Sequence, residues 1–304
     1  MNEINWPLRS FLFVPVIKRD WVAKAIRSGT DAVILDMEDS VTPADKKHAR
    51  SLLQSEIAEL KASNTLAVMR VNAFAEGGAE DIEHGMAADL FAVVLPKVSS
   101  AHEIVELDRC LAYHEGRVGK RLGETAIFPL PETATGLANA HAIASASARV
   151  KGLFTGINGG VSGDVARAFG FRSTAEGSEQ LYLHSKIVLD SRAAGAMHPI
   201  ASIMAGQISD LSGTERMIVR ARNLGFSGAV LIHPSHVSIA NRVMRPTRDE
   251  VAYYTRMLEA FAEAERRGLG AVRFEDQMID YAYLPVAREV IAEAEMLARR
   301  GINT

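Results

Sequence analysis

The sequence predicts an α/β protein, a closed (β/α)8 barrel followed by a C-terminal helical extension. Short apolar segments typical of buried strands alternate with amphipathic segments of helical periodicity. This strand–helix unit recurs eight times within about 240 residues, which is the number that such a barrel needs. The alternative is an open, doubly wound sheet, but no glycine-rich dinucleotide-binding loop follows the first apolar segment.

The predicted strands are continuous apolar runs, which indicates parallel strands covered on both faces. They are residues 8–14, 32–36, 65–71, 91–95, 126–130, 150–155, 198–204 and 229–232. Helices are expected at 19–28, 43–60, 79–88, 101–113, 135–146, 161–169, 176–194, 213–224 and 234–243.

Two further amphipathic helices, 248–267 and 285–300, have no strand before them. The segment 268–282 between them is expected to be a partly polar linker. We therefore predict a catalytic barrel over residues 1–247 and a helical extension over residues 248–304, which packs on a neighbouring subunit.

The composition is that of a globular protein with a sizeable core, because 48% of the 304 residues are apolar and 23% are charged. The net charge is −3, and no basic block indicates nucleic-acid binding. No apolar stretch reaches the ~18 residues that span a membrane, and the first residues do not resemble a signal peptide. We expect a cytoplasmic location.

Charged residues stand at the ends of most predicted strands, where barrel enzymes carry their catalytic groups. A buried charge without a partner is costly, so these residues must form pairs or bind a ligand. The residues are Arg9 in the first strand, Asp36, Glu38 and Asp39 after the second, Arg70 after the third, Lys97 after the fourth, Glu132 after the fifth and Asp164 beyond the sixth.

The three acids after the second strand repel one another unless cations neutralise them. Arg9 and Arg70, from other strands, are the candidate partners, and Lys97 is expected to add supporting charge. For Asp36 we favour a structural salt bridge in the barrel mouth. For Asp39 a helix N-cap remains equally open.

Glu132 and Asp164 are the candidate metal ligands. Two carboxylates completed by water suit Mg²⁺, or Mn²⁺, which can hold a 2-oxo or hydroxy acid. Arg70 is expected to pair bidentately with the carboxylate of that acid. The glycine-rich stretch that ends at Gly163 either cradles a carboxylate or phosphate or forms a plain turn.

Together these residues resemble the citrate lyase β-subunit-like group of the HpcH/HpaI aldolase/citrate lyase family, which includes malyl-CoA and citramalyl-CoA lyases. The most specific match is AVILDMEDSV at residues 32–41, followed by Lys46, Ala49 and Arg50. The segments 8–15, 70–72, 95–98, 132–136, 232–234 and 277–280 match in the family's order. One departure is that the family's Gly-x-x-Asp after the sixth strand is replaced by an inserted loop ahead of Asp164.

The resemblance implies Mg²⁺ on Glu132 and Asp164, with Arg70 on the substrate carboxylate. It implies CoA-thioester substrates in many members, with basic residues near the first helix on the CoA phosphates. The local candidates are Arg9, Lys18, Arg19 and Lys24. Asp280, from the extension of a neighbouring subunit, would complete the site of a homo-trimer or hexamer.

The function that follows is a Mg²⁺-dependent carbon–carbon lyase or aldolase with Asp280 as the base. Three alternatives stay open. They are an acyl-CoA thioesterase at the same site, a pyruvate-type 2-oxo-acid aldolase without CoA, and a non-catalytic subunit that binds an organic acid.

Overall fold

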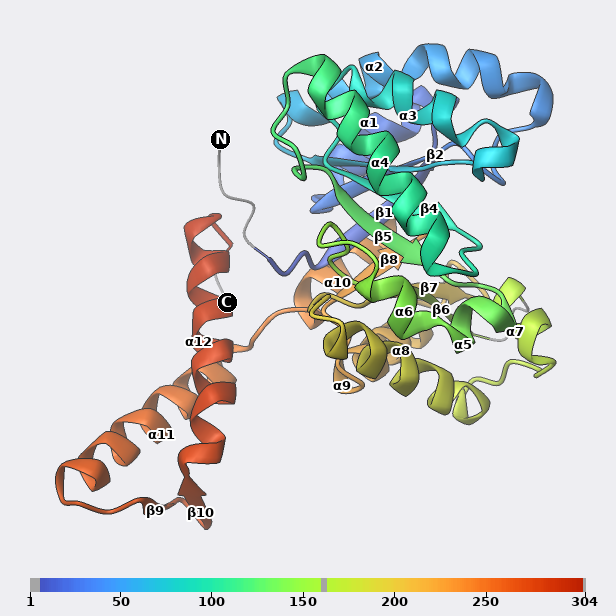
Figure 1. Cartoon of the computed structure of the whole chain (residues 1–304). Helices are drawn as coiled ribbons and strands as arrows, with labels where there is room; N and C mark the ends of the chain where they lie inside the picture. Colours follow the sequence, from blue (N-terminus) through green and yellow to red (C-terminus); the bar gives the residue numbers. More distant parts are fainter. Residues whose placement is uncertain (1–5, 160–162, 303–304) are drawn as a thin grey trace. The chain divides into compact units, whose positions relative to one another are not determined.

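The computed structural model describes residues 6–159 and 163–302 (Figure 1). The described residues divide into two compact units. One is Leu8–Met244, and the other consists of the described parts of Met1–Pro7 and Arg245–Thr304. Each unit is considered by itself below. None of the helices in the described ranges combines the length and apolar character needed to cross a membrane.

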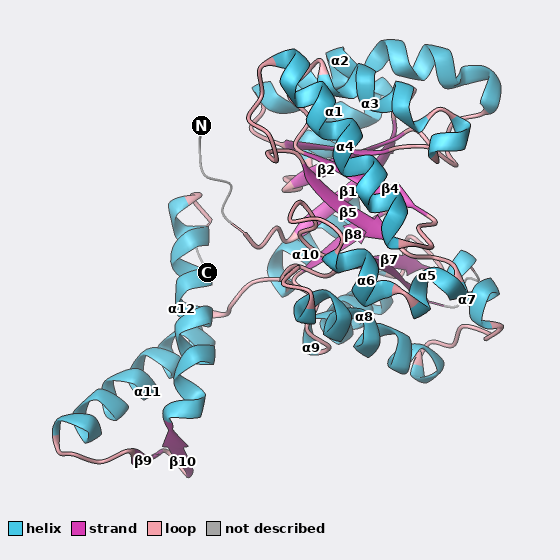
Figure 2. Ribbon diagram, viewed as in Figure 1, coloured by secondary structure: helices cyan, strands magenta, loops and turns pink. Residues whose placement is uncertain are grey.

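The larger unit is built on eight parallel strands, and neighbouring strands pair in the order β5-β4-β3-β2-β1-β8-β7-β6. This sheet, surrounded by helices in Figure 2, confirms the predicted (β/α)8 barrel. The strands are β1 (Ser10–Pro15), β2 (Ala32–Asp36), β3 (Leu66–Arg70), β4 (Ala92–Pro96), β5 (Ala126–Leu130), β6 (Phe154–Gly159), β7 (Ile200–Ala205) and β8 (Gly228–Leu231).

The barrel closes between β5 and the chain just before β6. The N–H of Ile127 donates to the carbonyl of Arg149 at 2.9 Å, and the N–H of Lys151 donates to the carbonyl of Ile127 at 3.2 Å. A strand was predicted at 150–155, but β6 begins only at Phe154. Gly152 lies between these segments, and a side chain there would collide with the carbonyl group of His198.

The helices lie outside the sheet and follow their strands as predicted, with shifted ends. They are α1 (Arg19–Arg27), α2 (Lys46–Ala62), α3 (Gly78–Met86), α4 (Ala101–Val118), α5 (Ala134–Ala138), α6 (Ala140–Ser145), α7 (Asp164–Phe169), α8 (Leu181–Ala193), α9 (Leu211–Asn223) and α10 (Val237–Val243). The single helix predicted at 135–146 is wrong, because the chain breaks at Asn139 between α5 and α6.

Alternation along the strands separates the barrel interior from the layer under the helices. Leu12 on β1 and Val33 on β2 belong to the large cluster that the helices cover. Phe11, Phe128 and Phe154, from β1, β5 and β6, contact one another with ring centroids 4.8–5.7 Å apart. Because β1 pairs only with β2 and β8, this contact crosses the interior of the barrel.

The smaller unit contains α11 (Arg248–Arg266), a hairpin of β9 (Ala271–Phe274) and β10 (Gln277–Asp280), and α12 (Leu284–Arg299). Met257, Phe261, Ile279, Leu284 and Ala287 form its core. The prediction of a linker over 268–282 is wrong, because the hairpin fills most of it. Its four-residue strands are largely exposed, so they lack the apolar run that marks the barrel strands.

Candidate active site

Asp36 and Arg70 meet at the mouth of the barrel, where β2 and β3 end. They are register partners on adjacent strands. The Arg70 Nε and Nη2 atoms donate to the two carboxylate oxygens of Asp36, both at 2.7 Å. Burial alone would raise the pKa of Asp36, but the Arg70 guanidinium outweighs it and holds this pKa below its usual value. The predicted salt bridge inside the barrel mouth is therefore confirmed.

Glu38 connects Arg70 to Lys97. One carboxylate oxygen of Glu38 lies 2.9 Å from Arg70 Nη1, and the other lies 2.7 Å from Lys97 Nζ. Burial raises the pKa of Glu38, and the two cations only partly offset that effect. Lys97 Nζ also lies 3.2 Å from Asp39. Asp39 therefore forms an ion pair, and it does not cap the 3-10 helix that begins at Pro43, whose N-cap is Thr42.

Arg70 is further immobilised by Phe13 of β1. The guanidinium carbon lies 4.8 Å from the centre of the Phe13 ring, which is within the range of a cation–π contact. With Nε and Nη2 bound to Asp36 and Nη1 only 2.9 Å from Glu38, the guanidinium already contacts two carboxylates. The sequence interpretation missed Phe13. Its inward position could have been predicted, because residues two apart on a strand share a face and Phe11 points into the barrel.

Glu132 stands two residues after the end of β5, and it is half-buried. Its Oε1 atom is buried without a hydrogen-bond partner in the described part of the chain. Burial raises the pKa of Glu132 to about 7; the charge of Arg70 opposes this, and the neighbouring carboxylates of Glu38 and Asp164 add to it. Glu132 and Asp164, the two predicted metal ligands, are thus close enough to influence each other.

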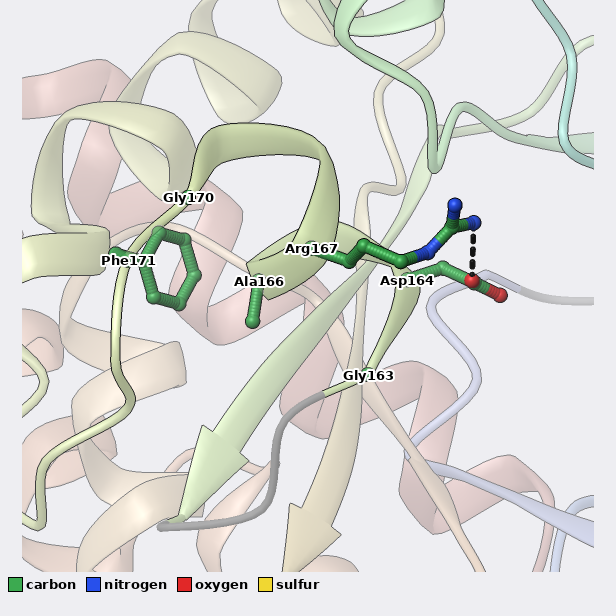
Figure 3. A pocket seen from close by; sticks show the side chains of 6 residues that line it. All are labelled: Gly163, Asp164, Ala166, Arg167, Gly170 and Phe171. Atoms are coloured by element: carbon green, nitrogen blue, oxygen red, sulfur yellow. Dashed lines mark hydrogen bonds and ion pairs between the residues drawn. The ribbon is translucent and has the colours of Figure 1, made fainter.

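Asp164 is the first residue of α7 and lines an open pocket of about 510 Å³. Its carboxylate accepts a hydrogen bond of 2.8 Å from Arg167 one turn later. Figure 3 shows these two side chains reaching toward each other on one side of α7, with the ring of Phe171 on the other. The pocket lining also includes Gly163, Ala166 and Gly170.

Gly163, a predicted ligand-binding position, is the N-cap of α7 and has extended backbone angles. Residues 160–162 of the predicted glycine-rich cradle lie outside the described residues. Within residues 6–159 and 163–302, no group of three or more His, Cys, Asp or Glu side chains is gathered in a way that could hold a metal ion. A metal bound by Glu132 and Asp164 would therefore depend on water or substrate for its other ligands, as Mg²⁺ commonly does.

Arg9 is not part of this site, and its predicted role is wrong. It precedes β1, so the parallel strands place it at the amino-terminal end of the barrel, opposite the mouth. There its main-chain N–H, Nε and Nη2 donate to the carboxylate of Asp31 at 2.7–3.1 Å. Arg9 is buried and paired with Asp31, so it neither neutralises the acids after β2 nor reaches an exposed phosphate.

The other predicted CoA-binding residues follow the carboxyl end of β1, and their role stays a prediction. Lys18 closes the loop after β1, and Arg19 and Lys24 lie on α1; all three are exposed. The Arg19 guanidinium forms a 2.8 Å ion pair with the buried carboxylate of Glu56 on α2. Arg19 is therefore partly committed to the fold, whereas Lys18 and Lys24 present their charge to solvent.

Asp280, the predicted base, belongs to the smaller unit. It ends β10, and its side chain is exposed. Its Oδ1 atom accepts a 2.9 Å hydrogen bond from the N–H of Ala282, which caps the 3-10 helix Tyr281–Tyr283. The carboxylate is thereby held in a defined orientation at the end of the hairpin.

A buried polar network that the sequence interpretation left without a role supports the turn after β2. The Lys46 ammonium donates to the carbonyls of Met37 and Glu38 and to Asn72 Oδ1, at 2.6–2.7 Å. Asn72 in turn donates to the carbonyl of Met37 and to Asp81. A polar residue close behind a strand, as Asn72 is two residues after β3, was the signal available in the sequence.

The chain matches the family model HpcH/HpaI aldolase/citrate lyase over residues 9–234. It is 30% identical to a (3S)-malyl-CoA thioesterase of Cereibacter sphaeroides, over 96% of each chain. It is 28% identical to citrate lyase subunit beta of Escherichia coli, over 95% of this chain and 93% of that one.

A solved structure of CitE from Mycobacterium tuberculosis, in complex with magnesium, acetoacetate and coenzyme A, superimposes with a TM-score of 0.72. It has 29% sequence identity and covers 94% of this chain and 97% of that chain. These matches confirm the family that the sequence resembles. The chain belongs to the HpcH/HpaI aldolase/citrate lyase family.

Proposed function

We propose that this chain is a Mg²⁺-dependent carbon–carbon lyase that acts on a hydroxy or oxo acid as its CoA thioester. The observation that carries the proposal is the Glu132 carboxylate. It is half-buried at the barrel mouth, its Oε1 atom has no hydrogen-bond partner among the described residues, and its pKa is raised to about 7. A buried carboxylate oxygen without a hydrogen-bond donor is suited to bind a metal cation.

The donor set fits Mg²⁺, because Glu132 and Asp164 supply hard oxygen ligands and leave positions for water and substrate. In the family member of known structure that is named above, magnesium is present together with acetoacetate and coenzyme A. When bound here, Mg²⁺ would supply Lewis-acid stabilisation of the negative charge that develops on a substrate oxygen.

Arg70 would bind the carboxylate of the acid through the Nη1 and Nη2 N–H groups that do not face Asp36, beside the Glu38 carboxylate that lies 2.9 Å from Nη1. Asp36 and Phe13 keep the guanidinium in one orientation, so little side-chain freedom is lost on binding. The Lys97 ammonium, which is held by Glu38 and Asp39, adds positive charge beside this position. Lys18 and Lys24, with the exposed part of Arg19, are the candidates for the CoA phosphates.

Asp280 of a neighbouring subunit would act as the base. In the cleavage direction it takes the proton of the substrate hydroxyl, the carbonyl forms, and the adjacent carbon–carbon bond breaks to leave the enolate of the acyl thioester. Protonation of that enolate carbon then gives the acyl-CoA. This role requires that residues 248–304 pack on another subunit, in a homo-trimer or hexamer.

A second candidate is hydrolysis of the thioester at the same site. It is favoured by the 30% identity to a protein named (3S)-malyl-CoA thioesterase. Lyase activity converts malyl-CoA to acetyl-CoA and glyoxylate, whereas hydrolysis gives malate and free CoA. Chromatography of the CoA species, with a chemical assay for glyoxylate, separates the two reactions; citramalyl-CoA is tested in the same way.

Glu132→Gln tests the metal assignment by calorimetric titration with Mg²⁺. We expect wild-type protein to bind the ion and the variant to lose most of this affinity and all turnover. Asp280→Asn should keep Mg²⁺ binding and lose turnover. Asp276→Asn, which changes an exposed acid in the same hairpin, is the matched control and should behave as wild type. Turnover that is unchanged in Glu132→Gln would refute the metal site.

A further inference from the structure

We infer that Lys46 is a positioning residue, which holds the main chain after β2 so that the Glu38 carboxylate bridges Arg70 and Lys97. This inference rests on the proposed function for its meaning in catalysis. The structural relationship that it describes can also be tested without any ligand.

The main chain of Glu38 is held from two sides. Its N–H donates to the Asp36 carboxylate at 3.0 Å. Its carbonyl accepts from Lys46 Nζ at 2.7 Å, and the carbonyl of Met37 accepts from the same ammonium at 2.6 Å. With the backbone held at these points, the Glu38 carboxylate contacts both cations, Arg70 at 2.9 Å and Lys97 at 2.7 Å.

Lys46 donates all three of its hydrogen bonds to neutral acceptors, the third being Asn72 Oδ1. None of the basic-to-acidic ion pairs of the described residues includes Lys46. The residue is also the first of α2, where the helix dipole disfavours a positive charge. A cation kept at this position, without a carboxylate partner, is explained by the three acceptors that it gathers.

The acceptors of Lys46 are themselves fixed. Asn72 Nδ2 donates to Asp81 at 2.6 Å and to the carbonyl of Met37 at 2.9 Å. Asp81 is fully buried and also accepts from Arg50 Nε at 2.8 Å. Lys46 thus connects α2, the turn after β2 and the segment after β3 through one ammonium group.

The inference predicts which property of the site fails when Lys46 is replaced. Glu38, Arg70 and Lys97 would form the part of the site that recognises the acid. Glu132 and Asp164 are carried by the end of β5 and by α7, which Lys46 does not touch. Loss of the ammonium should therefore weaken binding of the acid and leave binding of the metal nearly unchanged.

The experiment compares Lys46→Met with Lys47→Met, its exposed neighbour on the same helix. Calorimetry measures the Kd of Mg²⁺, and then the Kd of acetoacetate in saturating Mg²⁺. For Lys46→Met we expect acetoacetate binding to weaken by about tenfold or more and Mg²⁺ binding to stay within about threefold. Lys47→Met should match wild type in both.

A crystal structure of Lys46→Met tests the geometry directly. We expect the Glu38 carboxylate to move away from Arg70 or Lys97. The distance from its oxygens to Arg70 Nη1 or to Lys97 Nζ should then exceed about 4 Å, the upper limit of an ion pair. If Lys46→Met does not fold, Lys46→Gln, whose amide retains fewer donors, replaces it in both measurements.

Three results for Lys46→Met would each overturn the inference. They are an unchanged affinity for acetoacetate, an equal loss of affinity for acetoacetate and Mg²⁺, and a Glu38 carboxylate that still contacts both Arg70 and Lys97. Wild-type protein that binds neither Mg²⁺ nor acetoacetate would instead overturn the proposed function, and the crystal structure would then decide the role of Lys46 alone.

Discussion

Asp36 and Arg70, register partners at the ends of β2 and β3, form two parallel hydrogen bonds of 2.7 Å. An arginine so bound still presents Nη1 to a second carboxylate, and the carboxylate of Glu38 lies 2.9 Å from it. The pair therefore does two things at once. It satisfies the buried charge of Asp36, and in the proposed function it orients Arg70 for the carboxylate of the substrate.

Arg70→Lys keeps the positive charge and removes the guanidinium donors that bind Asp36. It should show that these donors, and not the charge alone, are needed to bind the ligand. An ammonium cannot replace both N–H groups on Asp36 and still reach a ligand. We expect the affinity for acetoacetate in Mg²⁺ to fall more than about tenfold, and the free energy of unfolding to fall by about 1–3 kcal/mol. Arg117→Lys, which alters an exposed pair with Glu83, is the control for urea denaturation and calorimetry. Equal affinities in the two variants would contradict the assigned role of Arg70.

The stability of the metal-free protein should fall as the pH rises toward neutrality, and Glu132 should be one cause. Its pKa is raised from 4.5 to about 7 in the folded state, chiefly by burial. The folded state therefore binds more protons than the unfolded state between these values, so unfolding becomes easier as the pH increases through this window.

Glu132→Gln isolates this contribution, because glutamine does not titrate. We expect the free energy of unfolding of the variant, relative to that of wild type, to rise by roughly 2 kcal/mol between pH 5 and pH 8. Urea denaturation in EDTA measures it. Adding Mg²⁺ at pH 8 should stabilise wild type and not the variant. A difference between the two proteins that does not change with pH would show that Glu132 is not perturbed.

A buried ion pair stabilises the closure of the barrel at the start of β5 and β6. Arg149 Nη1 and Nη2 each donate to Glu115 at 2.7 Å, and Glu115 also accepts from the N–H groups of Gly123 and Thr125. Burial would raise the pKa of Glu115, but the bonds from Arg149 and these N–H groups hold it at about 2.

Arg149→Met should lower the free energy of unfolding by about 3–5 kcal/mol, since it leaves the buried Glu115 charge without its partner. Arg121→Met, which removes an exposed arginine near the same loop, should change it by less than about 1 kcal/mol. Addition of Glu115→Gln to Arg149→Met should recover part of the loss. Urea denaturation at pH 7 measures all four proteins, and equal stabilities would contradict the proposed closure.

Gly136 leaves no space for a side chain in the helix that follows Glu132. A Cβ there would collide with the carbonyl oxygen of Val98, whereas a Cβ at Gly116 in α4 would meet nothing within 4 Å. We expect Gly136→Ala to destabilise the protein by about 1–3 kcal/mol and to weaken Mg²⁺ binding. Gly116→Ala should stabilise it by about 0.5–1 kcal/mol with no effect on Mg²⁺. Thermal denaturation and calorimetry compare the two, and similar effects would count against the close contact.

The barrel itself was predictable from local patterns, because its strands are short apolar runs that alternate with helical segments. The ends of β2 and β5 agree with the sequence to the residue. Less could be predicted where the pattern is mixed. The hairpin of β9 and β10 is short and exposed, and β6 is displaced because residues 149–151 pair with β5 before the strand proper begins.

The sequence by itself determined the family, the fold class and the acids and cations available at the strand ends, since these follow from residue type and periodicity. Only the tertiary structure decided which charges meet. Arg9 and Arg70 look alike in the sequence, yet the parallel arrangement of the strands places one at each end of the barrel. Ion pairing depends on separations of a few ångströms between distant segments, and strand register, not spacing along the chain, sets those separations.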